Sequence, residues 1–71
     1  MTDIMLRFGN KVRRERIRLG ISQEELAARA GLHRTYIGMI ERAEKNITLG
    51  SIEKICNALG MSVGEFFKEF K

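Results

Sequence analysis

Apolar residues recur every three or four positions along most of this chain, which is the period of an α-helix. Five stretches show this spacing, and short segments containing glycine or polar residues separate them. No segment has the strict apolar–polar alternation that is typical of a β-strand. The pattern therefore predicts an all-α protein of five short helices that forms a single domain over residues 1–71.

The first helix is predicted over residues 1–19, and Gly20 ends it. Close to one of its faces lie the apolar residues Met5, Phe8, Val12 and Leu19. Another face carries the cations Arg7, Lys11, Arg14 and Arg18, and Arg13 and Arg16 complete the run of cations. Cations this dense repel one another unless counter-charges or phosphates lie near. They form either a solvated surface or a contact surface for a phosphate backbone.

Residues 22–42 predict two short helices joined by a tight turn. Ser22 and Glu25 have the spacing of a capping box, in which the serine caps the helix and the glutamate reaches back. Gly31 ends the first of these helices, because glycine tolerates a positive φ. Ile37 and Ile40 then fall on one face of the second helix, and its first residues are polar. This is the design of a helix-turn-helix motif.

The remaining chain predicts a loop over residues 43–47 and two more helices. Thr48 caps a helix that runs to Leu59, with an apolar side formed by Ile52, Ile55, Cys56 and Leu59. Gly60 stops it, and Ser62 with Glu65 forms a second capping box. The final short helix carries the apolar residues Val63, Phe66, Phe67 and Phe70.

The composition narrows the function. A net charge of +4 indicates an anionic partner, either nucleic acid or a membrane surface. No apolar run approaches the roughly 20 residues of a membrane span, and the N-terminus is unlike a signal peptide. The lone Cys56 suits the cytoplasm and is interpreted as a small core residue, with a free thiol near an interface as the alternative. No metal-ligand set or catalytic constellation is present, so we expect neither an enzyme nor a cofactor, metal or small-molecule ligand.

A family resemblance covers roughly residues 8–67. The stretch ERIRLGISQEELAARAGLH, followed by IERAEKN, resembles the lambda-repressor-like (Cro/C1, XRE-type) helix-turn-helix domain. The longer stretch RTYIGMIERAEKNITLGSIEKI is similar to the controller proteins of restriction–modification systems, which time endonuclease expression relative to the methyltransferase. The resemblance implies a compact five-helix fold and a transcriptional regulator that binds double-stranded DNA. The alternatives are a phage-type repressor, an antitoxin-like autoregulator, or a protein-interaction module that keeps the fold without binding DNA.

The same resemblance implies which residues contact DNA, because it places the second helix of the motif in the major groove. The implied base-reading residues are Arg34, Thr35 and Met39. The implied phosphate-contacting residues are Ser22, Gln23, Tyr36, Arg42, Lys45, Asn46 and Arg16. Gly38 leaves a gap within this helix. Either the gap brings the helix closer to DNA, or it lets Met39 reach a base, or it is only a tolerated weak position.

Two further expectations concern how the reading helix is held. The resemblance implies an ion pair between Arg16 and Glu41 that sets the angle of this helix, although Arg16 could also contact phosphate. Glu15 departs from the family pattern, which favours an apolar residue there, so the first helix is either rotated or solvated at that edge. His33 occupies a cap position where serine or threonine is commoner; it caps the helix, contacts phosphate or faces water.

The apolar C-terminal end predicts a homodimer. Either Phe66 or Phe67 closes the core, but one short helix does not readily bury every apolar side chain of this end. The predicted interface residues are Met61, Val63, Phe67 and Phe70, within a dimerisation region of about residues 49–71. A twofold dimer would set two reading helices about 34 Å apart on a pseudo-palindromic operator. The regulator would repress or activate by blocking or contacting RNA polymerase.

Overall fold

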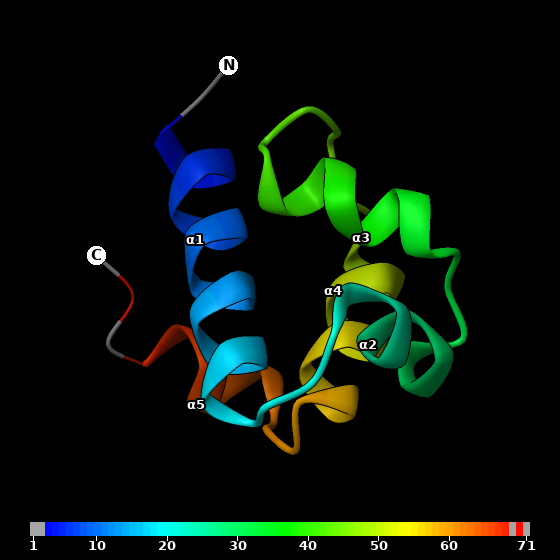
Figure 1. Cartoon of the computed structure of the whole chain (residues 1–71). Helices are drawn as coiled ribbons and strands as arrows, with labels where there is room; N and C mark the ends of the chain where they lie inside the picture. Colours follow the sequence, from blue (N-terminus) through cyan, green and yellow to red (C-terminus); the bar gives the residue numbers. More distant parts are fainter. Residues whose placement is uncertain (1–2, 69, 71) are drawn as a thin grey trace.

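The chain folds into five α-helices with short connections, as shown by a computed structural model that describes residues 3–68 and 70 (Figure 1). The helices are α1 (Asp3–Arg18), α2 (Gln23–Ala30), α3 (Arg34–Glu41), α4 (Leu49–Ala58) and α5 (Val63–Phe67). The all-α prediction is confirmed, and no strand occurs within the described ranges. The predicted start of the first helix at residues 1 and 2 lies outside the described residues. The last helix ends at Phe67, so the prediction that it carries Phe70 is wrong.

The helices enclose one apolar core. The pair α2 and α3 forms the helix-turn-helix unit, α1 packs against α3, and α4 packs against both α2 and α5 (Figure 1). The buried residues of the core are Phe8, Val12, Leu26, Ala27, Ala30, Ile37, Ile40, Ile55, Cys56, Leu59 and Phe66. Cys56 is therefore a core residue, as predicted, and its burial raises the pKa of the thiol.

Local side-chain contacts explain where the helices begin and end. Ser22 accepts a hydrogen bond from the Glu25 amide (3.0 Å), but the Glu25 carboxylate pairs with Arg29 instead of reaching back. Only half of the predicted first capping box therefore forms. The second box is complete, because the Glu65 carboxylate also accepts from the Ser62 amide (2.8 Å), and these bonds lower the pKa of Glu65.

The turns follow the same local logic. His33 caps α3, with its Nδ1 accepting from the Thr35 amide at 3.1 Å, which selects one of its three predicted roles. Gly31 has φ +70° at the end of α2, the left-handed conformation that its position predicted. The angle between α2 and α3 is thus set by a glycine and a cap that both lie between the two helices.

Lys11 corrects the prediction of a continuous cationic face on the first helix. Its side chain is buried, its Nζ donates to the backbone carbonyl of Phe66, and it lies 5.0 Å from the centre of the Phe66 ring. A lysine stem packs well against apolar surface, and the carbonyl near the end of a short helix needs a donor. Lys11 therefore attaches α5 to α1 and is not available to a phosphate.

The aromatic residues of the C-terminal end pack on one another within the chain. Phe66 closes the core, with its ring 5.2 Å from that of Phe8, and Phe70 turns back so that its ring lies 4.9 Å from that of Phe67. The Arg7 guanidinium covers the Phe70 ring at 5.1 Å. Phe67 and Phe70 are half-buried, so the chain itself covers part of the apolar surface on which the dimer prediction rests. The reason is that the chain leaves the helix after Phe67.

The crossing of α1 and α3 depends on Gly9. A Cβ atom at this position would collide with the carbonyl oxygen of Ile40 and lie 3.1 Å from that of Glu41. These are backbone atoms at the end of α3, so they cannot move aside without shifting the helix. Gly9 therefore lets the two helices approach closely.

We expect Gly9→Ala to reduce the free energy of unfolding by roughly 3 kcal/mol, because overpacking a helix crossing forces the backbone apart. Gly50→Ala is the matched control, since a Cβ there meets nothing closer than the Thr48 hydroxyl at 4.0 Å. The control should gain up to about 1 kcal/mol from helix propensity. Urea unfolding followed by circular dichroism measures both, and equal effects of the two substitutions would contradict the close crossing.

Candidate nucleic-acid interface

The helix-turn-helix unit carries an open polar hollow between α2 and α3. Its volume is about 590 Å³. The lining residues are Arg16, Ser22, Gln23, Glu24, Arg34, Thr35, Gly38 and Arg42. Six of the ten residues predicted to contact DNA line this hollow. Five of them lie at or beside the ends of α2 and α3, and the sixth, Arg16, lies on α1. A polar hollow bordered by three arginines suits an anionic, hydrogen-bonding partner.

The predicted base-reading residues differ in how far they reach the surface. Arg34 and Thr35 stand exposed in the first turn of α3, and Arg34 pairs with Glu24 at 2.9 Å. Met39 is half-buried and does not line the hollow. Tyr36 is half-buried and packs against the core. Among the predicted base-reading residues, the exposed side chains therefore lie in the first turn of α3.

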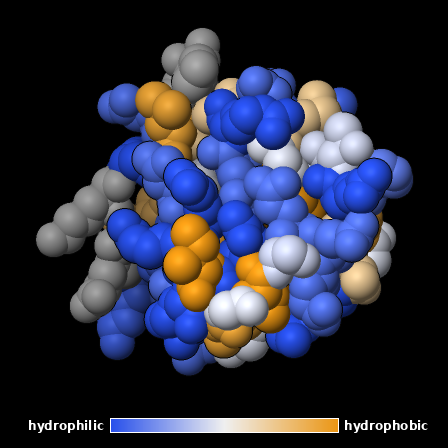
Figure 2. Space-filling model, viewed as in Figure 1, coloured by the Kyte–Doolittle hydropathy of each residue, from blue (hydrophilic) through white to orange (hydrophobic). Residues whose placement is uncertain are grey.

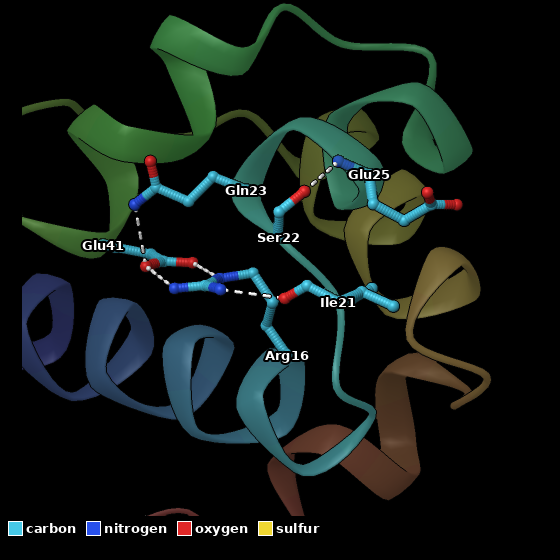
Figure 3. Close-up of polar contacts among 6 residues, drawn as sticks. All are labelled: Arg16, Ile21, Ser22, Gln23, Glu25 and Glu41. Carbon is cyan, nitrogen blue, oxygen red and sulfur yellow. Dashed lines mark hydrogen bonds and ion pairs between the residues drawn. The ribbon is translucent and has the colours of Figure 1, made fainter.

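One buried carboxylate joins three helices behind this surface. Glu41, at the end of α3, has a side chain that is 3% exposed, and it accepts two hydrogen bonds from Arg16 of α1 at 2.8 and 3.1 Å (Figure 3). Gln23, the first residue of α2, donates its Nε2 to the same carboxylate at 3.1 Å. The predicted ion pair is thus formed, and it extends to the second helix.

Arg16 is largely committed to this network. Its Nη1 donates to the backbone carbonyl of Ile21 at 2.9 Å, and its side chain is 14% exposed (Figure 3). The bidentate contact with Glu41 raises the pKa of the guanidinium. Three of the donor nitrogens already have partners, so the geometry favours the structural role of Arg16 over the phosphate contact that the sequence also allowed.

The remaining predicted phosphate contacts fall in two places. Ser22, Gln23 and Arg42 line the hollow, whereas Lys45 and Asn46 are exposed on the loop after α3. That loop borders a separate, mostly apolar pocket of about 200 Å³ against the start of α1. Lys45 and Asn46 therefore do not belong to the same hollow as Arg42.

The cations of α1 are divided by the fold. Arg13 and Arg14 are exposed, Arg18 pairs with Glu15 at 2.7 Å, and Lys11 is buried. Glu15 is thus accounted for by a local ion pair on a half-solvated edge. The surface in Figure 2 is mostly hydrophilic, with a few hydrophobic groups that gather chiefly near the lower centre of the view.

Three features of the site were not found from the sequence. Glu24 and Glu44 pair with Arg34 and Arg42, the latter at 3.0 Å, so both exposed arginines have acidic partners. Glu44 follows Arg42 by two residues, so the sequence could have predicted this ion pair. Glu24 and Arg34 are ten residues apart and meet only because the turn brings α2 and α3 together. The third feature is Leu49, the first residue of α4. Its side chain is 85% exposed, and it lies within the predicted dimerisation region.

Among residues 3–68 and 70, no three histidine, cysteine, aspartate or glutamate side chains gather as a metal site would require. None of the described helices is long and apolar enough to cross a membrane.

The fold and the hollow define a protein of the helix-turn-helix class, and the helix-turn-helix family profile matches residues 12–66. Control protein C.MunI of a Mycoplasma species is 40% identical over 72 residues, covering 100% of this chain and 97% of the relative. Control protein C.BamHI of Bacillus amyloliquefaciens is 52% identical over 60 residues, covering 83% and 74%. The chain therefore belongs to the helix-turn-helix family and, within it, to the control proteins of restriction–modification systems.

Solved structures agree with this assignment. The crystal structure of the restriction–modification controller protein C.AhdI from Aeromonas hydrophila superposes with a TM-score of 0.88 at 38% identity, over 93% of this chain and 100% of that one. Controller protein C.Esp1396I, solved as a tetramer in complex with its natural 35 base-pair operator, gives a TM-score of 0.93 at 33% identity, over 99% and 92%.

The network around Glu41 makes a stability prediction. Glu41→Gln should lower the free energy of unfolding by about 3–5 kcal/mol, because it leaves the Arg16 charge nearly buried without its counter-charge. Glu25→Gln is the matched control, since it removes the partner of Arg29 in an exposed pair and should lose less than about 1 kcal/mol. Urea unfolding of both variants measures the difference. Similar losses would show that the buried pair does not hold the helices together.

Proposed function

We propose that this chain is a homodimeric, sequence-specific DNA-binding regulator of transcription that controls a restriction–modification system. The observation that carries the proposal is the contrast within α3. Its first turn exposes Arg34 and Thr35, while Glu41 at its other end is buried in an ion pair. A helix fixed at one end and exposed at the other suits insertion into the major groove. The relatives are control proteins rather than enzymes, so the function is binding.

Base reading falls chiefly to Arg34. Its guanidinium fork matches the O6 and N7 acceptors of a guanine, and the methyl and hydroxyl groups of Thr35 suit a thymine methyl or a phosphate. Arg34 must leave Glu24 to reach a base, but both partners of this pair are exposed. Releasing such a pair costs less than about 1 kcal/mol, which a bidentate contact to guanine exceeds. Met39, half-buried beside this turn, is the third candidate.

Phosphate binding fixes the register of the reading helix. Ser22, Gln23 and Arg42 surround the hollow, and Tyr36, Lys45 and Asn46 extend the contact surface along α3 and its following loop. These contacts supply affinity without sequence information. The regulator would work in the cytoplasm, and at a promoter it would block RNA polymerase or contact it, depending on where the operator lies.

Dimerisation would pair two reading helices on a twofold operator. The related C.Esp1396I was solved as a tetramer on its operator. In this chain Leu49 at the start of α4 is 85% exposed, and Val63 at the start of α5 is also exposed, which favours an interface that includes these side chains. Met61, Phe67 and Phe70 would contribute only their uncovered edges, because each already packs partly against its own core.

Arg34→Ala should weaken binding to the preferred operator by roughly 1–3 kcal/mol and relax the preference at one base pair per half-site. The operator is first selected from random duplexes, and affinities for single-base variants are then measured by fluorescence anisotropy. Arg29→Ala, which removes an exposed and ion-paired arginine outside the hollow, is the control and should leave the preference unchanged. An equal loss on every sequence would instead make Arg34 a phosphate contact.

Leu49→Glu should shift the chain from dimer to monomer at micromolar concentration, because a charge on each subunit would be brought into an apolar twofold contact. Ile17→Glu is the matched control, since Ile17 is 57% exposed on α1, outside the predicted dimerisation region. Sedimentation velocity measures the oligomeric state. A dimer that survives Leu49→Glu, or a wild-type chain that stays monomeric, would contradict the proposed interface.

A further inference from the structure

Gly38 is a buried position on the side of α3 that borders the hollow. Arg34, Gly38 and Arg42 are four residues apart in turn, so they share one face of the helix, and all three line the hollow. A glycine inside a helix costs about 1 kcal/mol relative to alanine. A Cβ atom here would lie 3.0 Å from Nη1 of Arg42 and 3.4 Å from Oε1 of Gln23. The space left by the missing side chain is therefore occupied by the Arg42 guanidinium.

The Gln23 side chain faces this space with a fixed orientation. Its Nε2 donates to the buried carboxylate of Glu41 at 3.1 Å, and its oxygen points away from Glu41 toward α3 (Figure 3). Reversing the amide would set its oxygen against the carboxylate of Glu41, which is unfavourable. Gln23 therefore presents an acceptor to the space beside Gly38, which the Arg42 guanidinium also borders.

Arg42 has free reach on the side away from Gly38. Its side chain is 56% exposed, and its ion-pair partner Glu44 is exposed as well. A pair in water is weak and screened by salt, so a phosphate can replace Glu44 readily. The guanidinium is thus held on its inner side by the shape of α3 and remains available on its outer side.

We propose that Gly38 is a positioning residue, whose missing side chain lets the Arg42 guanidinium lie against Gln23 at the edge of the hollow and bind a DNA phosphate there. This inference rests on the proposed function. It differs from the two other functions of the gap: Met39 is half-buried and does not line the hollow, and a closer approach of the helix would leave the gap empty. Because phosphate contacts carry no sequence information, the effect of Gly38 on binding should be the same for every sequence.

The test compares Gly38→Ala, Arg42→Ala and the double variant, with Arg29→Ala as the control for removing an exposed arginine. Affinities are measured on the selected operator, its single-base variants and an unrelated duplex, each from about 50 to about 200 mM salt. Arg42→Ala should weaken binding roughly tenfold on all of them and reduce the slope of log affinity against log salt by about 1. Gly38→Ala should shift both quantities in the same direction by a smaller amount.

Two readouts separate positioning from a structural role. Gly38→Ala should unfold at the same or higher urea concentration than the wild type, since only the mobile end of Arg42 must move, yet it should bind DNA less tightly. In the Arg42→Ala background the same substitution should change affinity by less than about twofold. An altered preference at one base pair, or an undiminished loss in that background, would overturn the inference. A wild-type chain without salt-dependent binding to any duplex would overturn the proposed function itself.

Discussion

The arrangement of this molecule depends on one buried carboxylate. Glu41 closes α3, and it is reached by Arg16 from α1 and by Gln23 from the start of α2. A carboxylate this far from water must have its partners in place, so the three helices cannot drift apart without exposing or orphaning a charge. The interaction adds little to stability beyond what an apolar contact would supply. Its contribution is geometric, because it fixes the angle at which α3 leaves the surface.

The site divides its polar groups by burial. The residues that hold α3 are almost inaccessible, whereas Arg34 and Arg42 project from it and are paired with exposed glutamates. Buried pairs respond little to salt, and exposed pairs are easily exchanged. The reading helix is therefore rigid in position while its arginines stay adaptable.

The sequence predicted the helices well because their signals are local: apolar spacing, serine and threonine caps, and glycines at the helix ends. It failed where the outcome depends on contacts between distant segments. Periodicity placed Lys11 on a cationic face. It gave no sign that the carbonyl of Phe66, 55 residues away, would accept a hydrogen bond from the lysine ammonium. The sequence predicted that the Glu25 carboxylate would accept a hydrogen bond from the Ser22 amide, but this carboxylate pairs with Arg29 instead. The motif residues around the hollow followed from the family resemblance, but the occupant of the gap at Gly38 required coordinates.

The contact between Lys11 and Phe66 has a consequence for how the chain folds. It joins residues near opposite ends of the chain, and the core around Phe8 is open until Phe66 arrives. A helix as short as α5 has no stability of its own, so the domain folds as one cooperative unit. A partly synthesised or proteolysed chain that lacks this segment would be unfolded, and it would not act as a weaker regulator. Only chains that include this last segment then contribute to the pool of folded regulator.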